Sequence, residues 1–267
     1  MAISIIIPAR YASTRFPGKP LAMLGDKAMI EHVHAKAVEA LGGDPDVRIA
    51  VATDDDRIAH FCRSKNFTVV MTPEDCPTGS DRVIEAADKL GMKADDVVIN
   101  LQGDAPLMPV SAIRAILNEF WVHTATKVAT PVKRLRWEEL DKLRESKKTT
   151  PFSGTTVIVN TQNRALWFSK TIIPGIRKEA AMREKTPYSP VYQHLGLYGY
   201  QLSTLERFTN MPAGVYEELE GLEQLRAIEN NMIIQAVIVD YAGRPAMTGV
   251  DSPEDLQRAE RLLRQAL

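Results

Sequence analysis

The residues best suited to chemistry lie near the start of the chain, in the segment PARYASTRFPGKP at residues 8–20. This segment carries cationic and hydroxyl side chains and a glycine: Arg10, Arg15, Lys19, Ser13, Thr14 and Gly18. Cations neutralise phosphate oxygens, hydroxyl and backbone N–H groups donate to them, and glycine lets the backbone approach a ligand closely. Pro8, Pro17 and Pro20 stiffen the segment more than a surface connection requires. We therefore predict a triphosphate-binding loop, with a solvated basic loop as the alternative.

Two aspartates are candidates for holding a divalent cation. Asp104 follows an apolar run at residues 97–101 and stands behind Gln102, whose amide could bind a base or a sugar hydroxyl. A carboxylate at the end of a strand, near a triphosphate loop, is placed to bind Mg²⁺, although an ordinary turn aspartate is the alternative. Asp251 precedes Ser252, which can itself cap the following helix. An ordinary residue before a helix and a second magnesium ligand therefore remain equally good interpretations of Asp251.

Polar residues in the second half could face a further ligand. In the segment HLGLYGY at residues 194–200, alternate residues of a strand would place His194, Gly196, Tyr198 and Tyr200 on one face. The glycine leaves room for a ligand, whereas a structural histidine is the alternative. Glu223 and Gln224 belong to a predicted helix, where a solvated polar face is the simplest interpretation.

These residues require a scaffold, and the first half alternates strands with helices. Strands are predicted at residues 3–7, 48–52, 67–71 and 97–101, and helices at residues 28–41, 56–64, 81–90 and 110–120. This order predicts a largely parallel sheet covered by helices on both faces, with ligands beyond the carboxyl ends of the strands. The acidic run Asp54, Asp55 and Asp56 is explained by helix capping.

The second half is less regular. Strands are predicted at residues 127–132, 156–160, 195–202 and 233–240, and helices at residues 137–146, 216–230 and 252–267. Residues 173–191 are rich in proline and charge, so we expect a loop there that moves as a lid or contacts a partner.

Composition limits the classes of protein. The 267 residues can bury a core in one large domain, and a formal net charge of -1 gives no reason to expect nucleic acid or a membrane surface as partner. The two cysteines, Cys62 and Cys76, lack the spacing of a metal site or a disulfide framework, which indicates a reducing compartment. No secretion signal or membrane-spanning run is visible, so we expect a cytoplasmic protein without membrane insertion.

Taken together, several segments make the chain resemble the 3-deoxy-manno-octulosonate (Kdo) cytidylyltransferases, or CMP-Kdo synthetases, over nearly its whole length. The segments are residues 8–20, 51–54, 78–82, 102–104, 194–200, 222–226 and 249–255. The resemblance implies a nucleotide-diphosphosugar transferase-like α/β fold, in which a mostly parallel twisted sheet carries helices on both faces. It implies one domain, 1–267, with a CTP-binding half at 1–125 and a sugar-binding and dimerisation half at 126–267 that forms a small subdomain. It further implies a homodimer that uses Mg²⁺.

The implied reaction is CTP + Kdo → CMP-Kdo + pyrophosphate, which activates the sugar for lipopolysaccharide biosynthesis. By motif position, the nucleotide would be bound by Pro8, Arg10, Ser13, Thr14, Arg15, Lys19, Thr78, Gly79, Ser80, Arg82 and Gln102. The sugar acid would be bound by Arg177, His194, Tyr198, Glu223 and Gln224. Arg10, Lys19, Asp104 and Asp251 would be catalytic, with the two aspartates ligating magnesium. The protein would act by positioning and charge neutralisation, without a side-chain general base.

Two departures from the family pattern bear on the choice of sugar. The family commonly has Glu at the position of Ala105, and Asn-x-Val-Lys near residues 153–156, where this chain has no lysine. Residues 15–17, 54–58, 192–194 and 211–214 look closer to the branch that activates 8-amino-3,8-dideoxy-manno-octulosonate, a sugar that brings its own cation. The alternatives are a cytidylyltransferase for another acid, such as a sialic acid or methylerythritol phosphate, and an inactive nucleotide-binding homologue.

Overall fold

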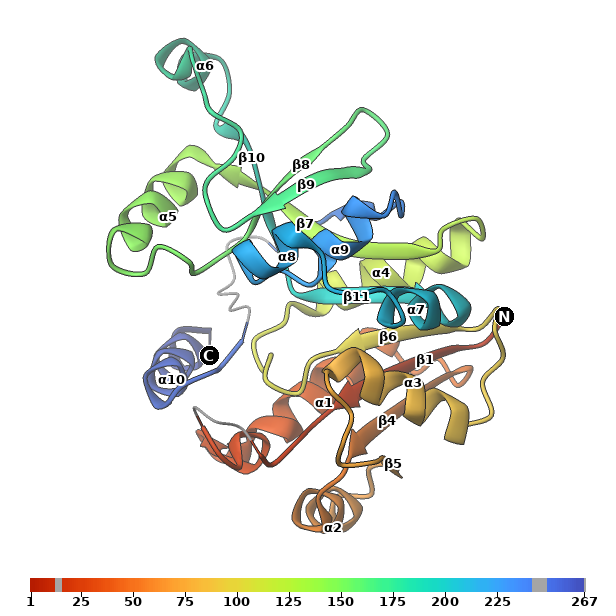
Figure 1. The fold of residues 1–267 in the computed structure, drawn as a ribbon. Coiled ribbons are helices and arrows are strands. Elements are labelled where there is room, and N and C mark those ends of the chain that lie inside the picture. The colour runs from red at the N-terminus through yellow and green to blue at the C-terminus, as the bar shows by residue number, and fades with distance from the viewer. Residues whose placement is uncertain (13–15, 242–248, 267) are drawn as a thin grey trace.

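A ten-stranded mixed sheet runs through the protein, with helices on both of its faces (Figure 1). The computed structural model describes residues 1–12, 16–241 and 249–266. The path of the sheet is β5-β4-β1-β6-β11-β7-β10-β8-β9, and β12 pairs with β7 beside this path. The predicted α/β class is confirmed.

The first half of the chain supplies the parallel part of the sheet. Its strands are β1 (Ile3–Pro8), β4 (Val47–Thr53), β5 (Val69–Met71) and β6 (Val97–Leu101), all paired in parallel. Every residue of β1 and β6 is buried, which explains why these strands are continuous apolar runs. The carboxyl ends of β4, β1 and β6 therefore meet at one edge of the sheet, where the loops that follow them gather.

Helices cover both faces of these strands. Buried side chains of α1 (Met29–Leu41), α2 (Asp56–Ser64) and α4 (Val110–Val122) share one core with Ile5 and Ile7 of β1. Those of α3 (Gly79–Lys89) and α7 (Leu202–Thr209) share another with Ile6. The alternation along β1 thus divides the core into two layers. The helices predicted in the first half are confirmed to within two residues at each end.

The second half supplies the antiparallel part. Its strands are β7 (Val128–Arg136), β8 (Thr156–Val159), β9 (Ala165–Ser169), β10 (Tyr188–His194), β11 (Leu197–Gln201) and β12 (Gln235–Ile238). Neighbours along the path from β6 to β9 are all antiparallel, whereas β12 is parallel to β7. β9 and α7 were not predicted. The remaining small elements are η1 (Lys19–Leu21), β2 (Met23–Leu24) and β3 (Lys27–Ala28).

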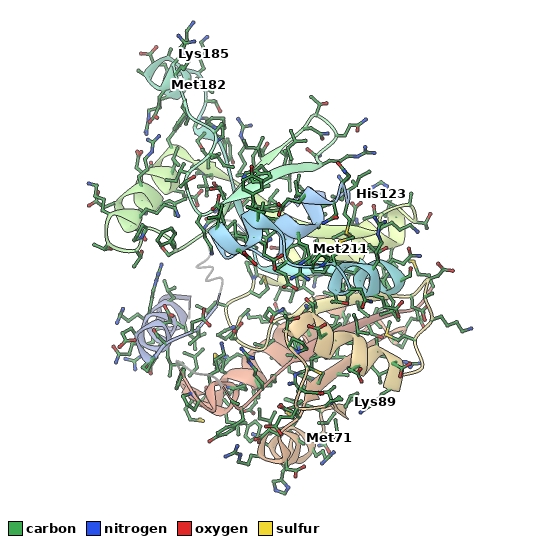
Figure 2. The ribbon with its side chains drawn as sticks, viewed as in Figure 1. Met71, Lys89, His123, Met182, Lys185 and Met211 are labelled. Atoms are coloured by element: carbon green, nitrogen blue, oxygen red, sulfur yellow. The ribbon has the colours of Figure 1, made fainter. Side chains whose placement is uncertain are left out.

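The expected loop at residues 173–191 is wrong in part. It contains α6 (Glu179–Lys185) and most of β10, and α6 projects from the body beside α5 (Trp137–Thr149) (Figure 1). Arg183 ties α6 to α5, because its Nη2 lies 2.6 Å from Asp141 Oδ1 and its guanidinium lies 4.6 Å from the Trp137 ring centroid. Lys185 stands at the tip of this arm (Figure 2). The prolines of the segment argued against a strand, because proline cannot donate a hydrogen bond to a neighbouring strand. The pairing of β10 with β7 shifts register between Tyr188 and Tyr192, where Pro190 lies.

The single helix predicted at residues 216–230 is also wrong. Two short helices, α8 (Val215–Glu220) and α9 (Gln224–Glu229), are separated by Gly221, whose φ is +61°. This left-handed conformation ends α8 and turns the chain before Glu223. The chain closes with α10 (Pro253–Ala266), which packs near β2 (Figure 1). None of the helices in the described ranges has the length and apolar character needed to cross a membrane.

Candidate active site

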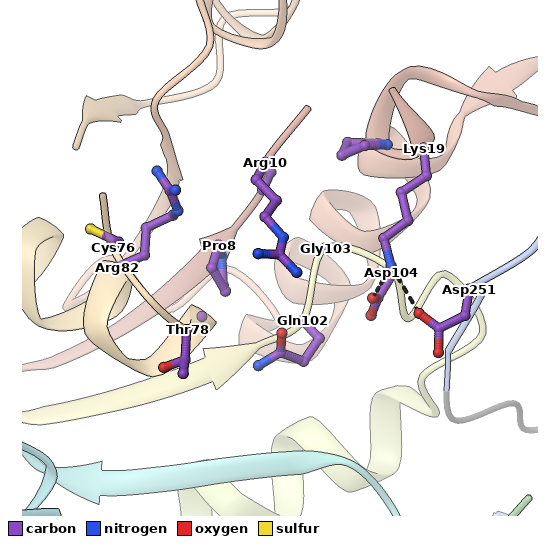
Figure 3. Close-up of a pocket in the computed structure, with 13 residues that line it drawn as sticks. Pro8, Arg10, Lys19, Cys76, Thr78, Arg82, Gln102, Gly103, Asp104 and Asp251 are labelled. Atoms are coloured by element: carbon purple, nitrogen blue, oxygen red, sulfur yellow. Dashed lines mark hydrogen bonds and ion pairs between the residues drawn. The ribbon is translucent and has the colours of Figure 1, made fainter. Parts of the chain in front are cut away.

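A cavity of about 170 Å³ opens beyond the carboxyl ends of β1 and β6 (Figure 3). It is called the first cavity below. Its lining includes Pro8, Arg10, Lys19, Cys76, Thr78, Gly79, Arg82, Gln102, Asp104 and Asp251. Segments separated by more than 200 residues of sequence therefore meet here, at the sheet edge where a parallel sheet is expected to bind ligands.

Backbone contacts fix the acidic wall of the first cavity. Gly103 N–H donates to Pro8 O at 3.3 Å, and a side chain at residue 103 would meet the same oxygen at 2.7 Å, so only glycine fits. Val250 N–H donates to Asp104 O at 2.8 Å. The backbone thereby joins the end of β6 to the segment before α10, and this contact brings Asp104 and Asp251 to one place.

One ammonium lies between these two carboxylates. Lys19 Nζ is 2.5 Å from Asp104 Oδ2 and 3.1 Å from Asp251 Oδ1, and it also donates to Val250 O at 3.3 Å (Figure 3). Two carboxylates at the mouth of a cavity suit Mg²⁺, which prefers oxygen ligands and takes only one or two from the protein when substrate phosphates supply others. The residues present therefore fit a magnesium ion. Within the described ranges, no group of three or more His, Cys, Asp or Glu side chains could form a complete metal cage.

Arg82 forms the opposite wall of the first cavity and is almost fully buried. Its Nη1 donates to Thr72 Oγ1 at 2.5 Å and lies 3.3 Å from Asp54 Oδ1. Burial and these two contacts hold the guanidinium in a fixed position at the edge of the cavity. The acidic run at residues 54–56 thus has two functions: Asp55 caps α2 as predicted, by accepting from Arg57 N and Ile58 N, whereas Asp54 orients Arg82.

The start of α3 also lines the first cavity. Thr78 caps the helix, since its side chain accepts from Asp81 N while the Asp81 carboxylate accepts from Thr78 N. Gly79 follows at the first turn, close to Gln102, whose Nε2 donates to Asn100 Oδ1 at 2.9 Å. The helix N-terminus presents N–H groups and a partial positive charge to the cavity.

A second cavity, of about 730 Å³, adjoins the first. Gln102 and Asp251 line both cavities. The residues that line only the second include Ser80, Asn100, Ser153, Thr155, Lys170, His194, Gly196, Tyr198, Tyr200, Glu223, Gln224 and Arg258. Its walls come from β6, β10, β11, the break before α9, and α10.

Several buried polar atoms of the second cavity have no partner. Tyr198 Oη, Glu223 Oε1 and Gln224 Nε2 lack a hydrogen bond among the described residues. Burial raises the pKa of the Glu223 carboxyl. Leaving a buried polar group unpaired costs about 1–3 kcal/mol, so three such atoms facing one cavity indicate a polar ligand. Glu223 and Gln224 are therefore not on a solvated helix face, because the break at Gly221 turns them inward.

His194 lines the second cavity with an uncharged imidazole. Its Nε2 lies 2.9 Å from Thr130 Oγ1, and burial lowers the pKa of its imidazole to about 3, with the nearby Lys170 charge adding to the effect. Its ring centroid is 5.3 Å from that of Tyr198. His194 ends β10 while Tyr198 lies on β11, yet both line the cavity together with Gly196 and Tyr200, as the alternation predicted.

Two lysines near the second cavity were missed. Lys170, directly after β9, lines the cavity, and its ammonium interacts electrostatically with the Glu220 and Asp251 carboxylates. Lys147, near the end of α5, donates to Ser153 O at 2.6 Å, Gly154 O at 3.1 Å and Lys170 O at 2.5 Å. Burial lowers the pKa of both ammonium groups. Strand β9 was not predicted from the sequence, so nothing there placed Lys170 beside residues 153–156.

Some predicted residues are not brought to the cavities. Ser13, Thr14 and Arg15 lie outside the described residues. Arg177 is exposed in the segment between β9 and α6 and lines neither cavity, so its predicted proximity to the other sugar-binding residues is not seen. The segment that contains Arg177 leads from β9 outward to the projecting helix α6.

Known proteins share this architecture. The cytidylyltransferase family model matches residues 4–234. A 3-deoxy-manno-octulosonate cytidylyltransferase of Maricaulis maris is 42% identical over 98% of this chain and 97% of its own length. The chain belongs to the CMP-Kdo synthetase family of cytidylyltransferases.

Other members of the family differ in the sugar that they are named for. An 8-amino-3,8-dideoxy-manno-octulosonate cytidylyltransferase of Shewanella baltica is 40% identical over 98% of this chain and 99% of its own length. A solved CMP:2-keto-3-deoxy-manno-octonic acid synthetase in complex with CTP has a TM-score of 0.81 and 32% identity, with complete coverage of both chains. The family therefore includes relatives for both sugars at nearly equal identity to this chain.

Proposed function

We propose that the protein transfers the cytidylyl group of CTP to a 3-deoxy-octulosonic acid, Kdo or its 8-amino analogue, and releases pyrophosphate. The observation that carries this proposal is the boundary between the cavities, which Gln102 and Asp251 line on both sides. A nucleotide in the first cavity and a sugar acid in the second would meet at this boundary. Relatives named for both sugars support the substrate class.

The first cavity is the proposed CTP site. Arg10 and Lys19 supply cations to the triphosphate, and the N-terminus of α3 supplies backbone donors. Gln102 has an amide, and Arg82 a fixed guanidinium, that can bind the base and ribose. A related protein was solved in complex with CTP, which agrees with this placement. Ser13, Thr14 and Arg15 remain predicted triphosphate ligands by motif position.

Asp104 and Asp251 would hold magnesium at the boundary of the two cavities. When bound, Mg²⁺ neutralises the α-phosphate and makes the proton of an adjacent hydroxyl easier to lose. The anomeric oxygen of the sugar attacks the α-phosphorus in line, the bond from this phosphorus to the pyrophosphate oxygen breaks, and the hydroxyl proton passes to solvent. His194 is too weakly basic to accept this proton, because its pKa is lowered to about 3. The protein thus acts by positioning and by charge neutralisation.

The second cavity is the proposed sugar site. Tyr198, Glu223 and Gln224 present unpartnered polar atoms to the sugar hydroxyls, and the Lys170 ammonium can pair with the sugar carboxylate. Lys170 supplies the basic side chain that residues 153–156 lack, so an 8-amino group is not required to provide a cation. We assign residues 1–125 to the CTP-binding half and residues 126–267 to the sugar-binding and dimerisation half, with a homodimer still a prediction.

The decisive experiment measures pyrophosphate release from CTP and Mg²⁺ with Kdo, 8-amino-Kdo or N-acetylneuraminate. Release with one or both octulosonic acids, and none with N-acetylneuraminate, is expected. Release only with N-acetylneuraminate would overturn the substrate class. Binding of CTP without release from any of the three acids would indicate a nucleotide-binding homologue or a different acid.

A further inference from the structure

The ammonium of Lys19 occupies the space between the two candidate metal ligands. It contacts Asp104 Oδ2 and Asp251 Oδ1 at once, and its side chain is only 12% exposed. A third bond to Val250 O uses its remaining donor. The same lysine lines the first cavity, where the triphosphate is proposed to bind.

Two like charges this close together repel one another unless a cation lies between them. The described residues offer no third acidic, histidine or cysteine ligand at this place. Mg²⁺ loses its water reluctantly and is bound through one or two carboxylates only when phosphate oxygens complete its shell. The protein alone is therefore a poor magnesium site. Lys19 neutralises the two carboxylates without any need to remove water from a divalent ion.

We propose that Lys19 is a stand-in cation that holds Asp104 and Asp251 together until magnesium enters bound to CTP. The incoming ion displaces the ammonium from both carboxylates, and Lys19 then pairs with the triphosphate in the same cavity. One side chain thus keeps the site assembled without nucleotide and excludes free metal from it. The proposal rests on the proposed CTP and magnesium sites and adds an order: metal and nucleotide bind together.

Manganese binding without nucleotide tests this order. Mn²⁺ binding to the wild type, Lys19→Met and Lys19→Arg would be followed by electron paramagnetic resonance and by the relaxation rate of water protons. Lys19→Met should bind free Mn²⁺ about tenfold more tightly than the wild type, because the carboxylates lose their competing cation. Lys19→Arg keeps a cation and should bind Mn²⁺ as weakly as the wild type. Lys27→Met, at an exposed lysine of β3, is the matched control and should also behave as the wild type.

Addition of CTP should reverse the ranking. The wild type should bind Mn²⁺ and CTP together, whereas Lys19→Met should bind the pair more weakly than the wild type. Equal Mn²⁺ binding by the wild type and Lys19→Met without CTP would overturn the stand-in role. Loss of protein-bound Mn²⁺ from the wild type even with CTP present would instead overturn the proposed metal site. Lys19→Gln, which is also uncharged, repeats the comparison if Lys19→Met does not fold.

Discussion

A lysine stabilises the wall of each cavity, but the two ammonium groups bind different kinds of partner. In the first, Lys19 Nζ pairs with the side-chain carboxylates of Asp104 and Asp251, which another cation could take over. Behind the wall of the second, Lys147 Nζ donates to the backbone carbonyl oxygens of Ser153, Gly154 and Lys170, three residues that line this cavity. Carboxylates can exchange the lysine for another cation when ligands arrive, whereas backbone carbonyl oxygens are fixed in position by the fold. The first cavity therefore contains a lysine whose partners can be exchanged, whereas the wall of the second cavity is held by a lysine whose partners are fixed by the fold.

The largest effect is expected from the first cavity. Asp104→Asn removes one of the two proposed magnesium ligands and should lower kcat by about a thousandfold or more, since charge at the α-phosphate would no longer be neutralised. Pyrophosphate release measures the loss, and thermal unfolding shows whether the fold is kept. Asp26→Asn, at an exposed turn, is the control. Near-normal turnover by Asp104→Asn would refute the metal assignment.

An intermediate effect is expected from the ammonium that faces the second cavity. Lys170→Met removes the proposed partner of the sugar carboxylate and should raise the KM for the sugar about 10–100-fold, with the KM for CTP nearly unchanged. Initial rates with each substrate varied in turn measure both constants. Lys178→Met, at an exposed position before α6, should change neither. An equal rise in both KM values would show that Lys170 does not belong to the sugar site alone.

A smaller effect on the same KM is expected from the fixed lysine. Lys147→Met leaves several carbonyl oxygens without their donor, so we expect a loss of about 1–3 kcal/mol in the free energy of unfolding. The KM for the sugar should rise a few fold, because residues 153–154 line the second cavity, while kcat stays nearly constant. Urea unfolding and initial rates measure both. Its neighbour Lys148, 70% exposed, gives the matched control Lys148→Met, and identical behaviour of the two variants would remove any special role for Lys147.

The effect that is smallest at neutral pH appears only in acid. The pKa of His194 falls from 6.5 to about 3 on folding, so the unfolded chain binds a proton that the folded one excludes. The associated stability is fully present above pH 6.5 and is lost as the pH falls toward 3. His194→Gln should therefore flatten the pH dependence of the free energy of unfolding in this window, with little change in slope above pH 7. Urea unfolding at several pH values measures the slope, and His60→Gln, at an exposed histidine, should keep the slope of the wild type.

The difference between the two cavities also explains what the sequence could predict. The first cavity follows from strands that are buried on both faces, because such strands read as apolar runs and the loops after them gather at one edge. Arg10, Lys19, Gln102 and Asp104 are visible in that way. The sequence left two interpretations of Asp251 open, because contacts between distant segments, such as the bond from Val250 N to Asp104 O, bring it to the site.

The second cavity depends on contacts that local sequence does not encode. Glu223 and Gln224 look like a solvated helix face until Gly221 breaks the helix. Lys170 follows β9, which pairs with β8. The residues of β9 have no pattern that predicts a strand, so the position of Lys170 beside β8 was not foreseen. Lys147 acts on the cavity by binding backbone oxygens, and a helical lysine of this kind cannot be told from a solvated one by spacing alone.

The bond from Val250 N to Asp104 O has a consequence for protein synthesis. A chain emerging from the ribosome folds its N-terminal parts first, so the parallel strands β1, β4, β5 and β6 can form well before residue 251 is made. Such a partial chain has most of the first cavity but only one of the two carboxylates. The partner of Asp104 is translated almost 150 residues later. Under the proposed function, nascent or truncated chains should therefore bind nucleotide without consuming it. Under the proposed function, the proofreading of chain length is thus built into the site, because a chain that ends before Asp251 would lack one of the two proposed magnesium ligands.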